Sequence, residues 1–154
     1  DAIRVDDAIP LPDEAPLAGV RALVVDDQEE ARVTLSKFLS ECGAVITTVS
    51  SGAEALEVLS DPPGGARPDV LVCDIAMPDE DGYATLRRVR ALEHERGMAP
   101  SQQIPAIALT AMAQSEDRLR ALGAGFKMHL AKPVEPAELV VVIASIVGQS
   151  RLKL

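Results

Sequence analysis

The chain has 154 residues, which is the size of a single domain, and its hydrophobic (47%) and charged (25%) fractions are those of a globular protein. With no Trp, two Phe and one Tyr, its core must be aliphatic. The formal net charge of -9 argues against direct nucleic-acid binding, and no apolar run approaches the roughly 18 residues of a membrane span. We therefore expect no membrane contact by this segment, and without a signal-like start we expect a cytoplasmic location.

Residues 1–16, DAIRVDDAIPLPDEAP, are acidic and rich in proline, which predicts a linker or tail. A domain over 17–150 and a short tail over 151–154 follow. The apolar run 20–25 predicts the first strand. Apolar residues then recur at helical spacing, and Asp27 with Glu30 resembles a capping box at the start of that helix.

Further strands and helices alternate along the rest of the chain. The remaining strands are predicted at 44–49, 70–73, 104–110 and 127–131. The remaining helices are predicted from Ser51 to about Leu59, around Leu86–Leu92, around Leu119–Leu122, and from Pro136 to about Gly148. Ser51 and Glu54 form a second capping-box pattern. Strands that alternate with helices predict an α/β fold, with a doubly wound five-stranded parallel sheet covered by helices on both faces.

Most of the expected strands end in a residue that can carry chemistry. These residues are Asp26 and Asp27 after the first strand, Asp74 after the third, Thr110 after the fourth and Lys132 after the fifth. In such a sheet the ligand crevice lies at the carboxyl ends of the strands, so the side chains should converge. Carboxylates held close together repel one another, and Mg²⁺, which prefers oxygen ligands, would relieve that repulsion.

A cation and a hydroxyl beside a metal-bound carboxylate suit a phosphoryl group, whose oxygens need positive charge and hydrogen-bond donors. Lys132 and Thr110 would supply them, and Asp74 could act as the nucleophile and form an aspartyl phosphate. The sequence contains no glycine-rich phosphate loop and no evident Ser-His-acid arrangement.

Four motifs resemble the response-regulator receiver domain of two-component signalling. They are VVDD at 24–27, CDIAMPDEDGY at 73–83, ALTAMA at 108–113 and LAKPVEP at 130–136. The resemblance covers about 17–147 and implies a flavodoxin-like sheet with strand order 2-1-3-4-5. It also implies that Asp74 accepts phosphate from a histidine kinase or a histidine phosphotransfer protein.

The same resemblance implies roles at the matching positions. Asp27 and Asp74 would bind Mg²⁺ directly, Asp26 would act mainly through water, and the backbone carbonyl of Ala76 would be a further ligand. Lys132 would pair with the phosphoryl oxygens.

Thr110 would bond the phosphoryl group and couple it to a conformational switch. The Lys132–Pro133 bond is implied to be cis. The switch position, often Tyr or Phe in the family, holds His129, which is either a polar switch residue or an ordinary strand residue.

Other residues have simpler interpretations. Cys42 and Cys73 lie in apolar segments without a metal-binding pattern, which indicates buried thiols. The loop acids Asp79, Glu80 and Asp81 are expected to be solvated.

The last helix contains LVVVIASIV, Leu139 to Val147, which is apolar nearly all round. Either it is simply well buried, or its outer face pairs with another copy in a homodimer.

Two contexts and two rival functions stay open. The domain would be a stand-alone regulator or the receiver of a hybrid histidine kinase, and it would assist its own phosphorylation without being a turnover enzyme. The first rival is a phosphorylation-independent interaction module. The second is a Mg²⁺-dependent phosphohydrolase with an Asp nucleophile, which Ala76 disfavours because such enzymes place a second acid there.

Overall fold

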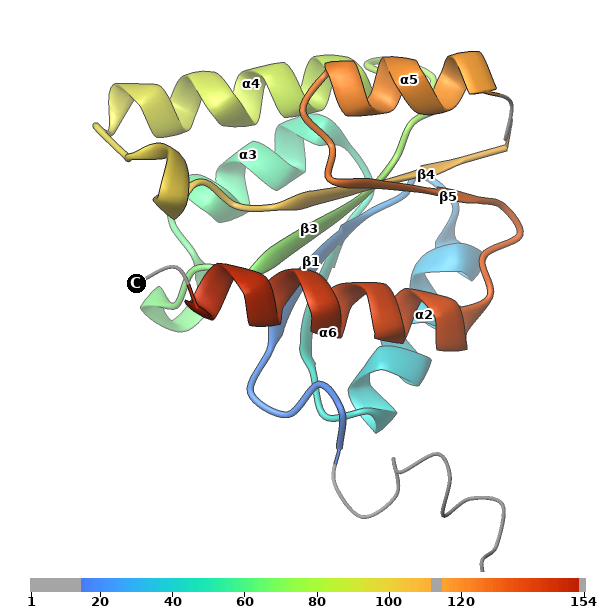
Figure 1. Cartoon of the computed structure of the whole chain (residues 1–154). Coiled ribbons are helices and arrows are strands. Elements are labelled where there is room, and N and C mark those ends of the chain that lie inside the picture. The colour runs from blue at the N-terminus through green and yellow to red at the C-terminus, as the bar shows by residue number, and fades with distance from the viewer. Residues whose placement is uncertain (1–14, 112–114, 153–154) are drawn as a thin grey trace, which may run out of the picture.

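The computed structural model describes residues 15–111 and 115–152, which form one parallel sheet between two helical layers (Figure 1). The elements run in the order β1 (Arg21–Val25), α2 (Glu29–Glu41), β2 (Val45–Val49), α3 (Gly52–Ser60), the 3₁₀ turn η1 (Pro63–Gly65), β3 (Val70–Asp74), α4 (Gly82–Glu95), the 3₁₀ turn η2 (Pro100–Gln102), β4 (Ala106–Thr110), α5 (Ser115–Gly123), β5 (Met128–Ala131) and α6 (Pro136–Leu152). The strand order is β2-β1-β3-β4-β5 and every pairing is parallel. The predicted fold and strand order are confirmed.

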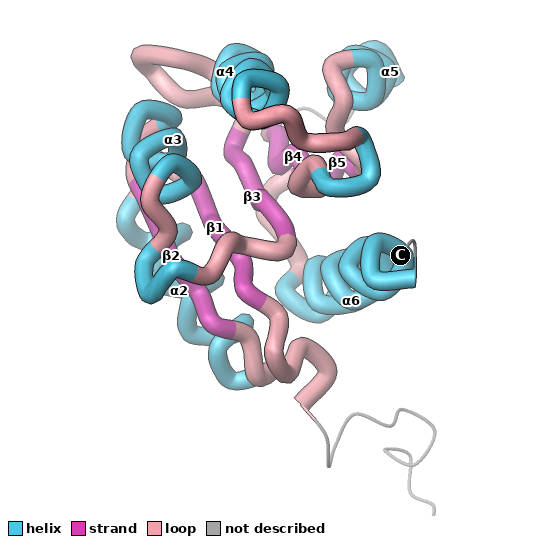
Figure 2. The backbone as a smooth tube through the Cα atoms, turned by 90° about the vertical axis from the view of Figure 1, so that its left-hand side faces the viewer, coloured by secondary structure: helices cyan, strands magenta, loops and turns pink. Residues whose placement is uncertain are grey.

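Two separate hydrophobic clusters lie on the two faces of the sheet. Helices α2 and α6 cover one face, and α3, α4 and α5 cover the other (Figures 1 and 2). Successive side chains of a strand point to opposite faces. In β1, Ala22 and Val24 therefore pack under α2 and α6, whereas Leu23 and Val25 pack under α3 and α4.

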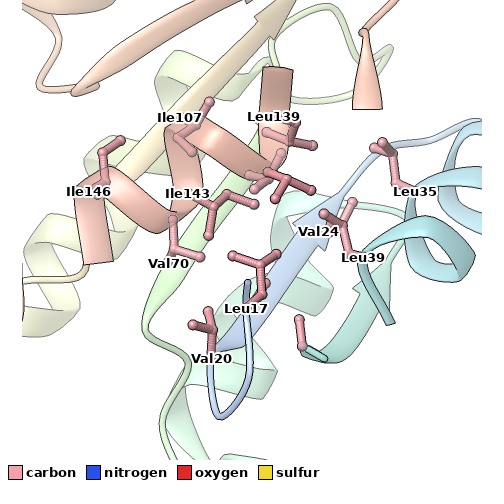
Figure 3. Packing of buried hydrophobic residues seen from close by; sticks show 14 of the residues in the cluster. Leu17, Val20, Val24, Leu35, Leu39, Val70, Ile107, Leu139, Ile143 and Ile146 are labelled. Atoms are coloured by element: carbon pink, nitrogen blue, oxygen red, sulfur yellow. The ribbon is translucent and has the colours of Figure 1, made fainter. Parts of the chain in front are cut away.

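The cluster under α2 and α6 includes a residue that precedes the first strand. Leu17 is fully buried and lies among Leu39 of α2, Val24 of β1 and Ile143 of α6 (Figure 3). Its backbone N–H donates to the carbonyl of Cys42 at 2.8 Å. Burying a leucine side chain stabilises a fold by about 1.5–3 kcal/mol, so Leu17 is an integral part of this packing.

One predicted helix start is confirmed and one is wrong. Ser51 caps α3, since its Oγ accepts the N–H of Glu54 at 3.1 Å; the reciprocal bond runs to the N–H of Ser50 rather than to that of Ser51 itself. The box at Asp27 and Glu30 is absent, because Gln28 is the N-cap of α2 and provides no side-chain cap.

Other boundaries differ from the prediction by a few residues. Strand β4 begins at Ala106 instead of residue 104, since Pro105 has no N–H to donate to the sheet. Helix α6 continues to Leu152, past the expected end at Gly148. Among the described residues of α6, Val141 is exposed. The residues that face the sheet are buried, namely Leu139, Val140, Ile143, Ile146 and Val147. No helix in the described ranges is both long and apolar enough to cross a membrane.

Candidate functional site

Three carboxylates meet at the carboxyl edge of the sheet. Asp26 follows β1 and Asp74 ends β3, and these neighbouring strands bring both side chains into the interior, where they are 0% and 2% exposed. Asp27 is exposed beside them. One carboxylate oxygen from each residue lies within 4.8 Å of the others. The predicted convergence of Asp26, Asp27 and Asp74 is therefore present.

An ammonium group bridges the two buried acids. Lys132 Nζ lies 3.3 Å from Asp26 Oδ2 and 3.2 Å from Asp74 Oδ2. The residue directly follows β5, and its backbone N–H donates to the carbonyl of Thr110 at 2.7 Å. The peptide bond to Pro133 is cis, as the family resemblance implied.

The charges of this cluster shift the pKa of its members in opposing ways. Burial raises the pKa of Asp74 above its ordinary value, and the negative charge of Asp26 adds to that rise, while Lys132 partly offsets it. Burial by itself would lower the pKa of Lys132. The two carboxylates outweigh it, so the pKa of Lys132 lies above its ordinary value and the ammonium form is favoured.

Backbone donors orient both buried carboxylates. Asp26 Oδ1 accepts the N–H of Gln28 at 2.9 Å, and Asp74 Oδ1 accepts the N–H of Ala76 at 3.3 Å. Asp26 Oδ2 is buried and accepts no hydrogen bond from any described residue. Among those residues, its polar contact is the ion pair with the Lys132 ammonium group. A buried carboxylate oxygen without a hydrogen-bond donor, next to two more carboxylates, fits a hard cation such as Mg²⁺.

The site opens into a cleft of about 750 Å³ between α2 and the segment after β5. Asp26, Asp74 and Lys132 are among its charged lining residues. Ala31 and Leu35 of α2 contribute apolar walls, together with other residues of the cleft. The cleft is thus open to an incoming group at the same place where the charges converge.

The expected switch residues lie on β4 and β5. Thr110 is 7% exposed at the end of β4, and its strand partner is Ala131. His129 pairs with Ala108, and its Nε2 is buried without a hydrogen-bond partner among the described residues. Because Leu130 packs under α2 and α6, the neighbouring His129 faces the opposite side of the sheet, toward α4 and α5.

The loop between β3 and α4 contains contacts that the sequence did not reveal. Asp79 is exposed, as predicted, but Asp81 caps α4 by accepting the N–H of Ala84 at 2.9 Å. Glu80 binds Arg88 of α4, with Nη1 at 2.8 and 3.1 Å from its two carboxylate oxygens. Both acids were expected to be merely solvated. The spacing from Asp81 to Ala84 could have indicated a helix cap, whereas no periodic signal connects a loop acid with Arg88.

Both cysteines are free thiols, and Cys73 is buried as predicted. Cys42 is only partly buried. Burial raises the pKa of both thiols, which keeps them protonated and unreactive. Neither residue belongs to the carboxylate cluster.

Comparison with known proteins identifies a family and several relatives. Residues 22–144 match the model of the family described as "Response regulator receiver domain". An uncharacterized 14.6 kDa protein of Leptolyngbya boryana is 42% identical over 124 residues, which cover 80% of this chain and 87% of that protein. Hybrid signal transduction histidine kinase D of Dictyostelium discoideum is 36% identical over 80% of this chain, which corresponds to only 8% of the kinase.

Solved structures share the fold. The receiver domain of sensor histidine kinase PA1611 from Pseudomonas aeruginosa, with a magnesium ion coordinated in its active-site cleft, is 33% identical and has a TM-score of 0.70. That similarity covers 85% of this chain and 99% of the other. A response regulator described as putative, from Chloroflexus aurantiacus, is 32% identical with a TM-score of 0.70, over 84% and 98% of the two chains.

Proposed function

Because the chain belongs to the response regulator receiver domain family of two-component signalling, we propose that Asp74 accepts a phosphoryl group from a phosphohistidine, with Mg²⁺ as cofactor. The observation that carries the proposal is the meeting of three carboxylates with Lys132 at the mouth of one cleft. Asp26, Asp27 and Asp74 would hold the ion, with the backbone carbonyl of Ala76 as a further ligand. When bound, Mg²⁺ supplies positive charge to the phosphoryl oxygens and to the carboxylates.

In the transfer itself, a carboxylate oxygen of Asp74 forms a bond to phosphorus as the bond from phosphorus to the histidine nitrogen breaks. The electron pair of the broken bond stays on the imidazole. Asp74 must be ionised to attack, and Lys132 opposes the effect of burial by stabilising that ionised form. Once the phosphoryl group has transferred, the Lys132 ammonium pairs with its oxygens.

The product would act as a switch between two conformations of the domain. Thr110 at the end of β4 would bond the phosphoryl group, and His129 would report that bond on the face covered by α4 and α5. The domain would assist its own phosphorylation and dephosphorylation, and we do not assign it a turnover activity. Its expected location, the cytoplasm, belongs to this proposal.

The partners follow from the chemistry. The proposed protein donor is a histidine kinase or a histidine phosphotransfer protein, since both carry the phosphohistidine from which a receiver domain accepts its phosphoryl group. The chain spans 8% of the Dictyostelium kinase, which fits the receiver of a hybrid kinase, and 87% of the 14.6 kDa Leptolyngbya protein, which fits a stand-alone regulator. A homodimer through α6, on which Val141 is 67% exposed, is also part of this proposal.

An interaction module that does not use phosphate is the second candidate function. Such a module does not need two buried carboxylates and a lysine in one cleft. Burying these charges costs desolvation free energy, which the ion pairs offset only in part, so their presence favours a site that uses them. The phosphohydrolase alternative lacks its second acid, since Ala76 occupies that position.

Intact-mass measurement with acetyl phosphate tests the proposal. The native chain should gain one phosphoryl group in the presence of Mg²⁺ and none without it. Asp74→Asn should gain none, and the control Asp79→Asn, an exposed acid in the following loop, should behave like the native chain. If the native chain also gains no mass with phosphohistidine donors, the interaction module becomes the better explanation.

A further inference from the structure

The loop between β3 and α4 carries Ala76, which lines the cleft, and the two ends of this loop are held differently. Near β3, the N–H of Ala76 donates to the side-chain Oδ1 of Asp74 at 3.3 Å. The N–H of Gly82, the first residue of α4, donates to the carbonyl of Ile75 at 2.9 Å and so closes the loop through its backbone. Toward α4, the loop holds Glu80, whose side chain is only 26% exposed although it is an acid in a surface loop.

Three elements meet at the carboxylate of Glu80. Arg88, on the second turn of α4, binds both oxygens through Nη1 at 2.8 and 3.1 Å. Gly52, the first residue of α3, lies so close that a Cβ atom built on it would be 2.6 Å from Glu80 Oε1. A carboxylate at the start of a helix also interacts favourably with the positive end of the helix dipole. Glu80 is therefore bonded to α4 and packs against the first residue of α3.

We propose that Glu80 and Arg88 are a positioning pair: they hold the β3–α4 loop so that Ala76 is presented to the cation site formed by Asp26, Asp27 and Asp74. The inference rests on the proposed function, because it concerns the affinity of that site for Mg²⁺. Neither residue touches the ion or the phosphoryl group. Their effect is transmitted through the backbone of the loop.

The direction in which Arg88→Met changes the affinity for Mg²⁺ separates this positioning role from long-range electrostatics. Arg88→Met removes a positive charge, so long-range attraction alone would make Mg²⁺ bind more tightly. Loss of the positioning pair loosens the loop and makes Mg²⁺ bind more weakly. Arg87→Met is the matched control, because Arg87 is the adjacent exposed arginine and its side chain has no ion pair or hydrogen bond among the described residues.

Calorimetric Mg²⁺ titration of the full chain provides the test. We expect Arg88→Met and Glu80→Gln each to raise the Mg²⁺ dissociation constant roughly twofold to fivefold, the range that a partly exposed ion pair supports. The double variant should resemble either single one, because both remove the same contact. In the metal-free protein, the amide hydrogens of Ala76 and Met77 should exchange faster in Arg88→Met than in Arg87→Met.

Two outcomes contradict the inference in distinguishable ways. If the native chain binds Mg²⁺ and Arg88→Met binds it as tightly as Arg87→Met or more tightly, the positioning role is wrong while the proposed function stands. If the native chain binds no Mg²⁺, the proposed function itself is overturned, and the positioning role with it.

Discussion

Lys132 Nζ lies 3.2 Å from Asp74 Oδ2, although Asp74 ends β3, Lys132 follows β5, and β4 lies between these two strands in the sheet. The ammonium group reaches across the carboxyl edge and also contacts Asp26 at 3.3 Å. It thus neutralises part of the charge that the two buried acids bring together. The same contact is the one that the proposed phosphoryl transfer would use.

The first prediction concerns Asp74→Asn. Burial raises the pKa of Asp74, so its ionisation costs folding free energy, and the amide removes that cost while Lys132 keeps Asp26 as a partner. We expect the variant to be more stable by about 0.5–2 kcal/mol at neutral pH in metal-free buffer. Thermal denaturation measures the gain.

The pH dependence of that gain follows from the raised pKa. The folded state holds the proton of Asp74 more tightly than the unfolded state, so the native chain loses stability as pH rises from the ordinary aspartate pKa of about 3.9 through the folded pKa. The two proteins should therefore converge at lower pH. A variant less stable than the native chain at neutral pH would contradict this account.

The second prediction concerns Lys132→Met, which keeps the length of the side chain and removes its charge. Asp26 and Asp74 then face each other without a counter-charge, and we expect the free energy of unfolding to fall by about 1–3 kcal/mol. This loss is small for a buried ion pair because the Lys132 side chain is 24% exposed. Urea denaturation at neutral pH measures it. Added Mg²⁺ should restore part of the loss.

Alkaline pH provides a check on this second prediction. The pKa of Lys132 is raised in the folded state, so its contribution is complete below the ordinary lysine pKa of about 10.4 and is lost as pH rises through the folded value. The difference between the native chain and Lys132→Met should shrink in that range. A difference that stays constant there would assign the loss to packing instead of charge.

The third prediction concerns Asp27, the exposed member of the carboxylate cluster. Saturating Mg²⁺ should stabilise the native chain, by about 2.7 kcal/mol at a concentration one hundred times the dissociation constant. In Asp27→Asn the melting temperature without metal should hardly change, since the side chain is exposed, but the Mg²⁺-dependent increase should be much smaller. Asp79→Asn is the control, and it should keep the full increase.

The fourth prediction compares two helical glycines. A Cβ on Gly52 would overlap Thr85 Oγ1 and lie 2.6 Å from Glu80 Oε1, so Gly52→Ala should destabilise the domain by about 1–3 kcal/mol. A Cβ on Gly148 of α6 meets no atom within 4 Å, so Gly148→Ala should stabilise it by about 0.5–1 kcal/mol. Denaturant unfolding of both variants tests the contrast. Equal effects would show that the close approach of α3 and α4 does not limit residue 52.

Much of the fold and the center of the site could be predicted from the sequence. The strands β1, β3 and β4 are buried on both faces and appear as continuous apolar runs, so the carboxylates that follow β1 and β3 stood out as interruptions. The parallel arrangement then placed Asp26 and Asp74 at the same edge of the sheet, and the strand order that the family resemblance implied made them neighbours. Those features depend on local patterns and on one topological rule.

Contacts between different elements could not be predicted in the same way. Glu93 of α4 is 3% exposed and accepts the backbone N–H of Ile104, which precedes β4, at 2.7 Å, yet in the sequence it is one acid among many. The pairing of Glu80 with Arg88 has the same character. Such pairs depend on how a loop closes, which neither periodicity nor capping patterns specify.

The division of the hydrophobic residues into two clusters has a mechanical consequence. Leu17, Leu39 and Ile143 fill one side of the sheet, while Ala121 of α5 and Phe126, which follows α5, belong to the other. The backbone of the strands separates these two compartments, so α5 can be displaced at the expense of one compartment alone. The cluster under α2 and α6 contains no described residue of α5, so the conformational change proposed above would leave that half of the core intact.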